Sequence, residues 1–362
     1  MKDWWIYGGE GAQEARRTVL TGLEAPPWRQ FAGTPDPEYT APRNEGTAWE
    51  RTEARGRGYV PDESEKDAVN TALYLRRPLL VTGKPGVGKS TLAYSVAADL
   101  GLGPVLHWPI TSRTTLRDGL YHYDAIGRLQ DANLHQMRTG GPGRATPDPA
   151  PETSAGSADG GAGAADASSI TPYLRLGPLG TALLAQDQPR VLLVDEIDKS
   201  DIDLPGDLLT VFEEGEFEIP ELARLAVRQP SARIATDDSP DDLVRVERGR
   251  VRCRAFPVVV LTSNGERDFP PPFLRRCIRL HMEPPGREKL ERIVRARLRI
   301  APEDGRYEDL IQSFITRGAD GDLATDQLLN AIHLRLNNAW SGPEERERFL
   351  STVMQRLTGP ST

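Results

Sequence analysis

Residues 81–91 read VTGKPGVGKST and continue the apolar run PLLV. The stretch fits the pattern G-x-x-x-x-G-K-[ST] without gaps. Its glycines let the backbone curl until successive N–H groups point inward at an anion. The following STLAYSVAADLG predicts a helix whose positive N-terminal end faces the same anion. A strand before the loop and a helix after it are the setting that this phosphate-binding motif requires, so the sequence predicts a nucleotide site.

The polar groups of the motif have distinct expected roles. Lys89 is expected to reach the β- and γ-phosphates, and the Ser90 hydroxyl is expected to ligate Mg²⁺. Thr91 stands where it can contact the α-phosphate. The residues predicted to bind ATP in this loop are Gly83, Lys84, Pro85, Gly86, Val87, Gly88, Lys89, Ser90 and Thr91.

A second motif, VLLVDEID, follows about a hundred residues later. Its four apolar residues predict a buried parallel strand, and the two acids come at the C-terminal end, where α/β sheets bind ligands. We expect Asp195 to hold the Mg²⁺ hydration shell together with Ser90, and Glu196 to polarise a water for attack on the γ-phosphate. An acidic strand end is often only a turn that caps a helix, but its place behind a phosphate loop favours the catalytic interpretation.

A third strand, predicted from FPVVVLTSNGE, ends at Asn264. An amide placed between the carboxylates and the γ-phosphate can orient the attacking water and report whether phosphate is present. A strand-terminal asparagine is more often a turn residue. The apolar lead-in and the position in the order of motifs favour a functional role for Asn264.

The stretch RDFPPPFLRRCIRL predicts a short helix that ends at Arg275 and Arg276. Two exposed arginines are ordinarily only solvated. In a ring-shaped oligomer, however, this edge faces the γ-phosphate of a neighbouring subunit, where an arginine finger is worth about 10³–10⁵ in rate. Both arginines are therefore predicted as catalytic residues.

The pattern of apolar residues divides the chain into three parts. From Gly58 to about Leu280, strand-like runs alternate with helix-like segments, which predicts a parallel sheet flanked by helices. Helical patterning then continues over residues 283–358, as in REKLERIVRARL and TDQLLNAIHLRLNNA. The predicted units are an N-terminal extension (1–57), an α/β core (58–282) and a small all-α domain (283–362).

Two segments depart from that rhythm. Residues 1–57 have no helical or strand period but contain several aromatic residues, namely Trp4, Trp5, Tyr7, Trp28, Phe31 and Trp49. Disordered segments are poor in tryptophan, so we expect an extended arm that inserts its rings into the core or a neighbouring subunit rather than a disordered tail. Residues 139–169 have no large apolar side chain and predict a disordered insert, with a neutral spacer favoured over a regulatory segment.

Composition limits the classes of partner and compartment. The net charge of −8 gives the chain no general attraction to nucleic acid or to an anionic membrane. Cys253 and Cys277 form no C-x-x-C pair, which favours a reduced chain without a zinc site. The N-terminus lacks the apolar core of a signal peptide, and no apolar run approaches the ~18 residues of a membrane helix. These features predict a cytoplasmic protein.

The order of these motifs resembles that of the AAA+ ATPases: phosphate loop, DE-ending strand, asparagine-ending strand, arginine-ended helix and helical lid. Three stretches, GPLGTALL, DEIDKSDIDLPGDLLTVFEEGEFEIPEL and LTSNGERDFPPPFLRRC, are similar to the MoxR-like branch of that family. The resemblance covers about residues 58–340. It implies a P-loop NTPase core with a C-terminal lid, and a β-hairpin between EFEIP and GRVRCRAF.

The resemblance implies the same roles for the residues named above, with Asn264 as the first sensor and Arg276 as the arginine finger. Arg275 occupies a slot where the family often has an acid. The family's second sensor is usually an arginine that opens the third lid helix, but that slot reads LATDQLL here. Arg335 lies farther along the same helix, which leaves the coupling between lid and phosphate in question.

Two other stretches have no family interpretation. The segment ITSRTTLRDGLYHYDAIGRL is either a structured loop over the sheet edge or an element that faces a partner or a pore, and the sequence favours neither. The alternating VRVERGRVRCR places Arg250, Arg252 and Arg254 on one face of a strand. Nearby acids (Asp237, Asp238, Asp241 and Asp242) favour a charge-paired hairpin over contact with nucleic acid.

The resemblance implies a homo-oligomeric, hexameric ring that hydrolyses ATP with Mg²⁺ to remodel a protein client. A von Willebrand factor A (vWA) domain protein of a bacterial defence or maturation system is one such client. The alternative is a regulatory nucleotide switch with slow hydrolysis, which the departure at the second sensor favours. A nucleic-acid translocase would need a basic surface, and the net charge argues against one.

Overall fold

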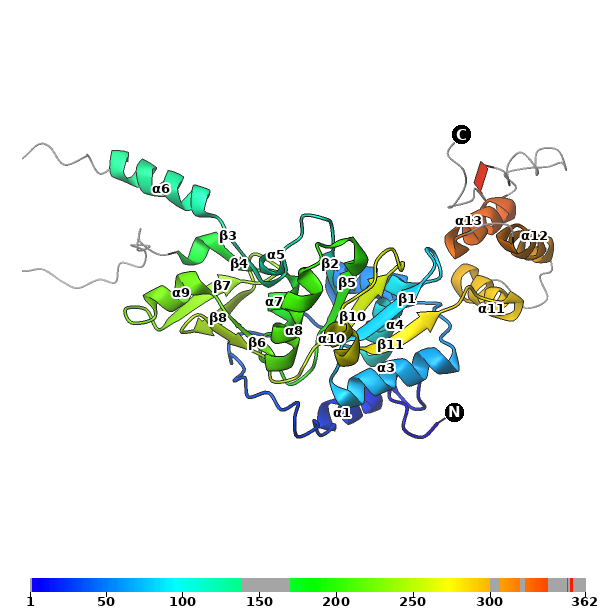
Figure 1. The fold of residues 1–362 in the computed structure, drawn as a ribbon, viewed down its shortest axis with the longest axis horizontal. Coiled ribbons are helices and arrows are strands. Elements are labelled where there is room, and N and C mark those ends of the chain that lie inside the picture. The colour runs from blue at the N-terminus through cyan, green and yellow to red at the C-terminus, as the bar shows by residue number, and fades with distance from the viewer. Residues whose placement is uncertain are drawn as a thin grey trace, which may run out of the picture.

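The computed structural model describes residues 2–138, 170–299, 307–319, 323–337, 350 and 352–353. Its centre is a five-stranded sheet in which every pair is parallel (Figure 1). In spatial order its strands are β11 (Ile278–Met282), β1 (Leu79–Gly83), β10 (Val258–Ser263), β5 (Val191–Asp195) and β2 (Leu106–Pro109). This confirms the predicted α/β class with a parallel sheet.

The sheet is buried on both faces, which explains why its strands read as continuous apolar runs. One face packs on the helices α3 (Glu63–Leu75) and α4 (Lys89–Leu100) through Leu79, Val81, Val191, Leu193, Val258 and Val260. The opposite face packs on α7 (Pro178–Ala182), α8 (Leu204–Glu214) and α10 (Pro271–Arg276) through Leu80, Leu192, Val194, Val259 and Leu261. Successive residues of the three central strands, β1, β10 and β5, therefore enter two separate cores.

Four of the five core strands were predicted, and β11 was missed. Its sequence, IRLHM, alternates apolar and polar side chains because it is an edge strand paired only with β1 within this sheet. Leu280 and Met282 are buried, while Arg279 and His281 are exposed. A five-residue alternation next to an arginine-rich helix carries little signal compared with a continuous apolar run.

A second sheet of six strands extends from the core. Its spatial order is β3 (Tyr121–Tyr123), β4 (Leu174–Leu176), β7 (Ser231–Ala235), β8 (Leu243–Glu247), β9 (Arg250–Arg252) and β6 (Glu216–Glu218). The antiparallel pairing of β6 with β9 is the hairpin expected between EFEIP and GRVRCRAF. Short helical elements accompany this sheet: α5 (Leu116–Leu120), α6 (Ala125–Arg138), η1 (Thr171–Tyr173) and α9 (Pro220–Leu225). The turn η2 (Ile197–Lys199) belongs to the core sheet, where it follows β5 and contacts β10.

The arginines of the VRVERGRVRCR stretch are paired with acids, as expected, but with different ones. Arg252 contacts Glu216 and Arg250 contacts Glu218 across the hairpin, 3.6 Å apart in the second pair. Arg254 lies 3.3 Å from Asp187. None of these three pairs involves the aspartates of the 237–242 loop, and one of those, Asp238, instead forms a buried pair with Arg190.

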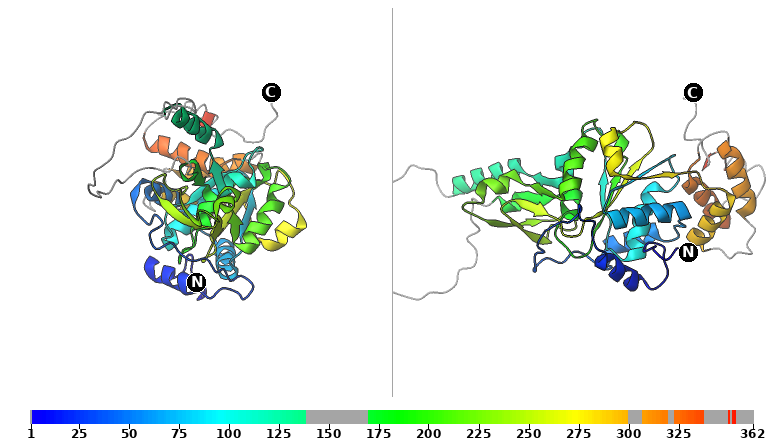
Figure 2. Two further views of the ribbon diagram at one scale, coloured as in Figure 1. Left: turned by 90° about the vertical axis from the view of Figure 1, so that its left-hand side faces the viewer. Right: turned by 60° about the horizontal axis from the view of Figure 1, so that its bottom comes forward.

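The C-terminal helices form a separate small core. They are α11 (Arg287–Leu298), α12 (Glu308–Ala319) and α13 (Thr325–Leu336). Their shared core consists of Leu290, Val294, Leu310, Ile311, Leu328 and Ile332, among other residues. Figures 1 and 2 place this lid (orange) at the end of the molecule opposite to α6 and α9. Most of the fourth expected helix, ERERFLSTVMQRL, and the whole 139–169 insert lie outside the described residues.

Residues 1–57 show no helical pattern in the sequence, yet two helices form there. The prediction of a segment without helices was therefore wrong. The two helices are α1 (Gln13–Gly22) and α2 (Gly46–Gly56). The buried face of α2 is Trp49, Thr52 and Gly56, which are spaced like a helix but include only one large apolar side chain. A Cβ on Gly56 would lie 2.5 Å from the Tyr94 carbonyl oxygen, so this glycine permits close packing of α2 on α4.

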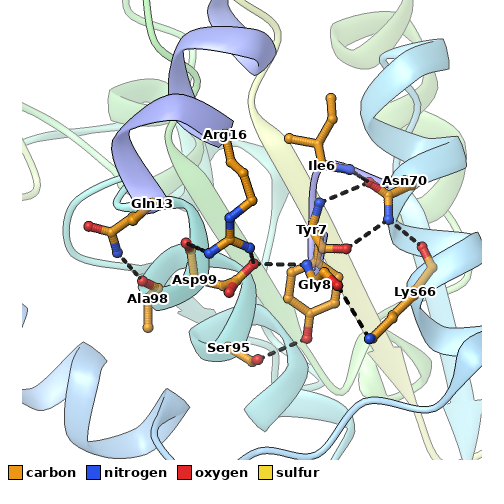
Figure 3. A network of polar contacts seen from close by, with 10 residues as sticks. All are labelled: Ile6, Tyr7, Gly8, Gln13, Arg16, Lys66, Asn70, Ser95, Ala98 and Asp99. Atoms are coloured by element: carbon orange, nitrogen blue, oxygen red, sulfur yellow. Dashed lines mark hydrogen bonds and ion pairs between the residues drawn. The ribbon is translucent and has the colours of Figure 1, made fainter. Parts of the chain in front are cut away.

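The arm does insert aromatic rings, and it inserts them into its own core. Trp5, Tyr7 and Trp49 are buried, whereas Trp28 is 71% exposed. Figure 3 shows how the backbone of residues 6–8 is held against α3 and α4. The Asn70 side chain accepts hydrogen bonds from the backbone N–H groups of Ile6 (2.7 Å) and Tyr7 (2.9 Å) and donates one to the Tyr7 carbonyl (3.0 Å).

Side chains of α4 complete this attachment. The Tyr7 hydroxyl lies 2.8 Å from the Ser95 hydroxyl, and the Gly8 N–H donates to Asp99 at 2.9 Å. Arg16 of α1 forms an ion pair with the same Asp99 at 2.5 Å (Figure 3). The arm is therefore tied to the helix that begins at the phosphate loop.

None of the helices among the described residues combines the length and apolar character needed to span a bilayer.

Both cysteines are unpaired, and burial raises the pKa of each thiol to about 12.

We predict that Asn70→Ala lowers the free energy of unfolding by about 3 kcal/mol, because it leaves the buried Ile6 and Tyr7 backbone groups without partners, each worth about 1–3 kcal/mol. Denaturant unfolding of the full chain measures the change. Trp28→Ala, also in the arm but at an exposed position, is the control and should leave stability within about 0.5 kcal/mol. An Asn70→Ala protein as stable as wild type would contradict this account of the arm.

Candidate active site

The phosphate loop joins β1 to α4, and its glycines adopt conformations that other residues rarely take. Gly86 has φ +75° and Gly88 has φ +103°, both in the left-handed region. A Cβ on Gly86 would also lie 2.2 Å from the Ala324 side chain at the start of α13. The loop is therefore shaped both by its own curl and by the close approach of the lid.

Lys89 is the best-connected side chain of the loop. Its ammonium donates to the carbonyl oxygens of Gly83 (2.7 Å) and Lys84 (2.8 Å) and to Asn264 Oδ1 (2.8 Å). The residue is only 7% exposed. Burial lowers the pKa of Lys89, and the carboxylates of Asp198 and Asp195 oppose that change.

Asp195 lies at the centre of a hydrogen-bonded cluster at the ends of the strands. Its Oδ1 accepts from Ser90 Oγ (2.7 Å) and Thr262 Oγ1 (2.6 Å), and its Oδ2 lies 3.3 Å from His107 Nε2. Burial acts to raise the pKa of Asp195, but these hydrogen bonds outweigh it and lower the pKa to about 2. The carboxylate is thus ionised throughout the neutral range, and its stabilising contribution is lost only as pH falls towards about 2.

Glu196 follows in a left-handed conformation with φ +62°. Its backbone N–H donates to Thr262 Oγ1 at 2.9 Å, and its carboxylate accepts from Lys199 Nζ at 2.8 Å. The Glu196 side chain is 43% exposed, so it borders the solvent-filled side of the site. The two neighbouring carboxylates have different partners: Asp195 contacts Ser90, Thr262 and His107, whereas Glu196 contacts Lys199.

Asn264 is positioned through its backbone as well as its side chain. The N–H groups of Asn264 and Glu266 both donate to Asp198 Oδ2, at 2.9 and 3.1 Å. Asp198 is only 3% exposed. This buried carboxylate therefore fixes the turn after β10, so that the Asn264 amide faces Lys89.

These groups surround one cavity of about 630 Å³, a volume in the range of nucleotide and drug-sized ligands. The loop contributes the Pro85–Thr91 segment, and the acids and amide contribute Asp195, Glu196 and Asn264. The remaining lining residues are Gly58, Tyr59, Val60, Thr262, Lys289, Ile293, Arg297, Ala324, Thr325, Asp326 and Leu329. Gly83 and Lys84 are not among them; they act through the carbonyls that hold Lys89.

Comparison of the sequence with protein-family models gives a match over residues 78–277 to the AAA domain of the dynein-related subfamily. The match spans more than half of the chain and contains the phosphate loop, the acidic strand and the asparagine strand. The chain belongs to this AAA family. It is therefore an ATP-hydrolysing enzyme of the AAA+ type.

Comparison with curated proteins gives no match. Among solved structures, the chain is similar to domain III of the replication initiation protein DnaA from Thermotoga maritima. The similarity has a TM-score of 0.38 and 14% identity, and it covers 82% of this chain and 95% of that one.

Arg275 and Arg276 lie away from the cavity of this AAA domain. Arg276 Nε donates to Glu213 Oε1 of α8 at 3.0 Å, and its side chain is 40% exposed. Arg275 offers its carbonyl to Arg77 at 3.1 Å. Neither residue is among those that line the cavity within the described parts of the chain.

The lid approaches the phosphate loop without an arginine at the start of α13. The Thr325 N–H donates to the Gly86 carbonyl at 3.3 Å, so the end of this helix contacts the loop through its backbone. Arg335 pairs with Asp309 of α12 at 2.5 Å, which keeps it inside the lid.

Sequence reasoning missed Thr262 and His107, which both contact Asp195. Thr262 stands two residues before Asn264 in LTSN, and it faces β5 because the parallel register places it opposite the strand end. His107 is one of the two exposed residues of the alternation in β2 and the only one with a polar side chain. A polar residue within an otherwise apolar strand end is the signal that was available in both cases.

Thr262→Val preserves side-chain shape but removes the hydroxyl that bonds to both Asp195 and Glu196. We predict a fall in kcat of about 5- to 100-fold, because a buried hydrogen-bonding group left unpaired costs about 1–3 kcal/mol. Steady-state ATPase assays and nucleotide titrations separate this fall from any change in affinity. Thr82→Val is the matched control, since its hydroxyl faces β11; equal rates for the two variants would refute the role of Thr262.

Proposed function

We propose that this AAA domain is the motor of a homo-oligomeric ring, hexameric as in the MoxR-like branch, that hydrolyses ATP with Mg²⁺ and remodels a partner protein in a chaperone-like manner. The observation that carries the proposal is the separation of the site into two parts. One chain brings Lys89, Asp195, Glu196 and Asn264 around one cavity. Arg275 and Arg276 are not among the residues that line that cavity, so we infer that they act on the nucleotide of a second subunit.

Within the cavity, the geometry suits each proposed role. Lys89 and the N–H groups of the curled loop bind the phosphates, and Asn264 lies beside the Lys89 ammonium, where the γ-phosphate and the attacking water meet. Glu196 is the proposed general base because its carboxylate borders the cavity and its backbone is fixed by Thr262. Lys199 holds the Glu196 carboxylate before the water arrives.

Ser90 and Asp195 are the proposed Mg²⁺ residues. A hydroxyl and an ionised carboxylate 2.7 Å apart are hard oxygen ligands of the kind this cation prefers. In the described residues no group of three or more His, Cys, Asp or Glu side chains is arranged to hold a metal ion. We propose that phosphate and water oxygens complete the Mg²⁺ shell. When bound, Mg²⁺ neutralises charge on the β- and γ-phosphates.

Arg276, with Arg275 beside it, is proposed to act on the neighbouring subunit. Its partner Glu213 also lies 3.6 Å from Arg29, a side chain that is 3% exposed and donates to the Phe212 carbonyl. The buried Arg29 therefore holds Glu213, and Glu213 holds the arginine finger at the surface.

The domain boundaries, the compartment and the client belong to the same proposal. We assign an N-terminal arm (1–57), a core (58–282) and a lid (283–362), and a cytoplasmic location in keeping with the buried thiols of Cys253 and Cys277. A vWA-domain protein is the proposed kind of client, on the MoxR-like resemblance alone.

A regulatory switch with slow hydrolysis is the second candidate, because α13 opens with no arginine towards the phosphates. A translocase has less support, since Arg250, Arg252 and Arg254 are all engaged with acids.

The ring is tested by ATPase rate against protein concentration. We expect the rate per subunit to rise with concentration and Arg276→Ala to lower it by about 10³-fold or more. Mixing Arg276→Ala with Glu196→Gln should restore part of the activity. At some of the mixed interfaces the Arg276→Ala subunit supplies an intact Glu196 and its Glu196→Gln neighbour supplies an intact Arg276. Arg254→Ala, another exposed and acid-paired arginine, is the control. A concentration-independent rate that ignores Arg276 would leave the switch as the better account.

The cation site is tested with Ser90→Ala. We expect the Mg²⁺ concentration for half-maximal ATPase to rise about tenfold, because one oxygen ligand is lost, and wild-type activity to vanish in excess chelator. Ser95→Ala, on the same helix but bonded to Tyr7, should need no more Mg²⁺ than wild type. Equal Mg²⁺ requirements for all three proteins would remove Ser90 from the site.

A further inference from the structure

The lid of this chain needs another means of responding to nucleotide. α13 opens with Ala324, Thr325 and Asp326, and none of these is basic. Arg335 is engaged with Asp309 inside the lid. Among the described lid residues that line the cavity, two are basic, Lys289 and Arg297, and both lie on α11.

Lys289 joins the lid to the core by two short ion pairs. Its ammonium lies 2.6 Å from Asp62 Oδ2 and 2.6 Å from Glu65 Oε1. The Lys289 side chain is 14% exposed and that of Glu65 is 4% exposed. Asp62 is 42% exposed, so the shielded pair is Lys289 with Glu65, and removing Lys289 leaves the Glu65 charge buried without its partner.

Glu65 connects its ion pair with Lys289 to the nucleotide cavity through Tyr59. Its other oxygen, Oε2, accepts from the Tyr59 hydroxyl at 3.0 Å and from the Asp62 N–H at 3.0 Å, the latter as part of the capping box of α3. The Tyr59 ring lines the cavity, and its edge lies 3.5 Å from the place of a Cβ on Gly88. Lid, acid, tyrosine and phosphate loop are thus in continuous contact.

Arg297 makes the second attachment, two turns farther along α11. Its guanidinium donates to the carbonyls of Arg55 (2.8 Å) and Ala54 (3.3 Å) in the last turn of α2. Gly58 then passes so close to α11 that a Cβ there would lie 3.1 Å from the Ala296 backbone. Lys289 and Arg297 therefore attach the lid to residues that come after and before residues 58–60 in the sequence.

Residues 58–60, which lie between these two attachments, line the apolar part of the cavity. Tyr59, Val60, Ile293 and Leu329 supply aromatic and aliphatic surface there, whereas the phosphate loop supplies the polar part. A nucleobase has flat apolar faces and phosphates are anionic, so the base fits against the apolar surface and the phosphates against the loop.

We propose that Lys289 and Arg297 are the positioning residues that couple the lid to the bound nucleotide, and that they do so through the base-side segment 58–60 instead of through the γ-phosphate. The inference rests on the proposed ATP site. Its consequence is that ADP and ATP engage the lid equally, because they have the same base and differ only at the end that the lid cations do not touch.

The test uses the full chain and compares Lys289→Met, Lys289→Arg, Arg297→Met and Arg335→Met. Kd is measured for ADP, ATP and inorganic tripolyphosphate, together with kcat, KM and amide-hydrogen exchange of α11. We expect the methionine variants at 289 and 297 to raise Kd for ADP and ATP alike, by about 5- to 50-fold, the range of ordinary coupling energies.

Other readouts separate coupling from simple loss of structure. Nucleotide should slow exchange in α11 of the wild type but not of Lys289→Met, tripolyphosphate should not slow it, and Lys289→Arg should regain most of the affinity. The lid-internal Arg335→Met should bind both nucleotides within about twofold of wild type. If Lys289→Met melts early, Glu65→Gln removes the same ion pair and keeps an amide beside Tyr59, and it should reproduce the affinity loss.

Two results would overturn the inference while leaving the proposed function in place: Lys289→Met and Arg297→Met binding as wild type, or Arg335→Met weakening ATP but not ADP. Wild type that binds no nucleotide, no better than Lys89→Ala, would refute the proposed function and the inference with it.

Discussion

The position of β10 between β1 and β5 is the constraint on which the site depends. Thr82 is opposite Ser263 on one side, and Leu261 is opposite Val194 on the other. Parallel strands in this register end at the same edge, which brings the phosphate loop, Asp195 and Asn264 together from three distant parts of the chain. A slip of one residue would turn every side chain of β10 to the other face of the sheet and remove the Thr262 hydroxyl from Asp195.

Elements whose signal lies in one continuous stretch of residues could be predicted from the sequence alone. The phosphate loop, four core strands and three lid helices each have a continuous signal, so their prediction needs no knowledge of the rest of the chain. The pairing of β6 with β9 was expected only from the resemblance to the MoxR-like branch. The edge strand β11 and the helix α2 were not readable, because their buried faces are short and α2 uses Thr52 and Gly56 where an apolar residue would be expected. Packing against α4, which no local pattern displays, decides those faces.

The contacts around the cavity show the same limit more clearly. Lys89 and Asp195 were found by motif, but Lys289 and Glu65 are 224 positions apart and neither belongs to a motif. Charged side chains on helices look like solvated faces in a sequence, and only the fold distinguishes those that remain in water from those that are buried against each other. The arginines of β9 illustrate the opposite case, since cross-strand glutamates neutralise what the sequence presents as a basic face.

The attachment of the arm also constrains the order of events during synthesis. Residues 6–8 are made before their partners on α3 and α4, which come as much as 91 positions later, at Asp99. At a synthesis rate of about 5–20 residues per second, residues 6–8 wait about 5–18 s before the last of their partners on α4 has been made. During that interval the side chains that become buried in the fold, such as Trp5 and Tyr7, are open to other binding partners.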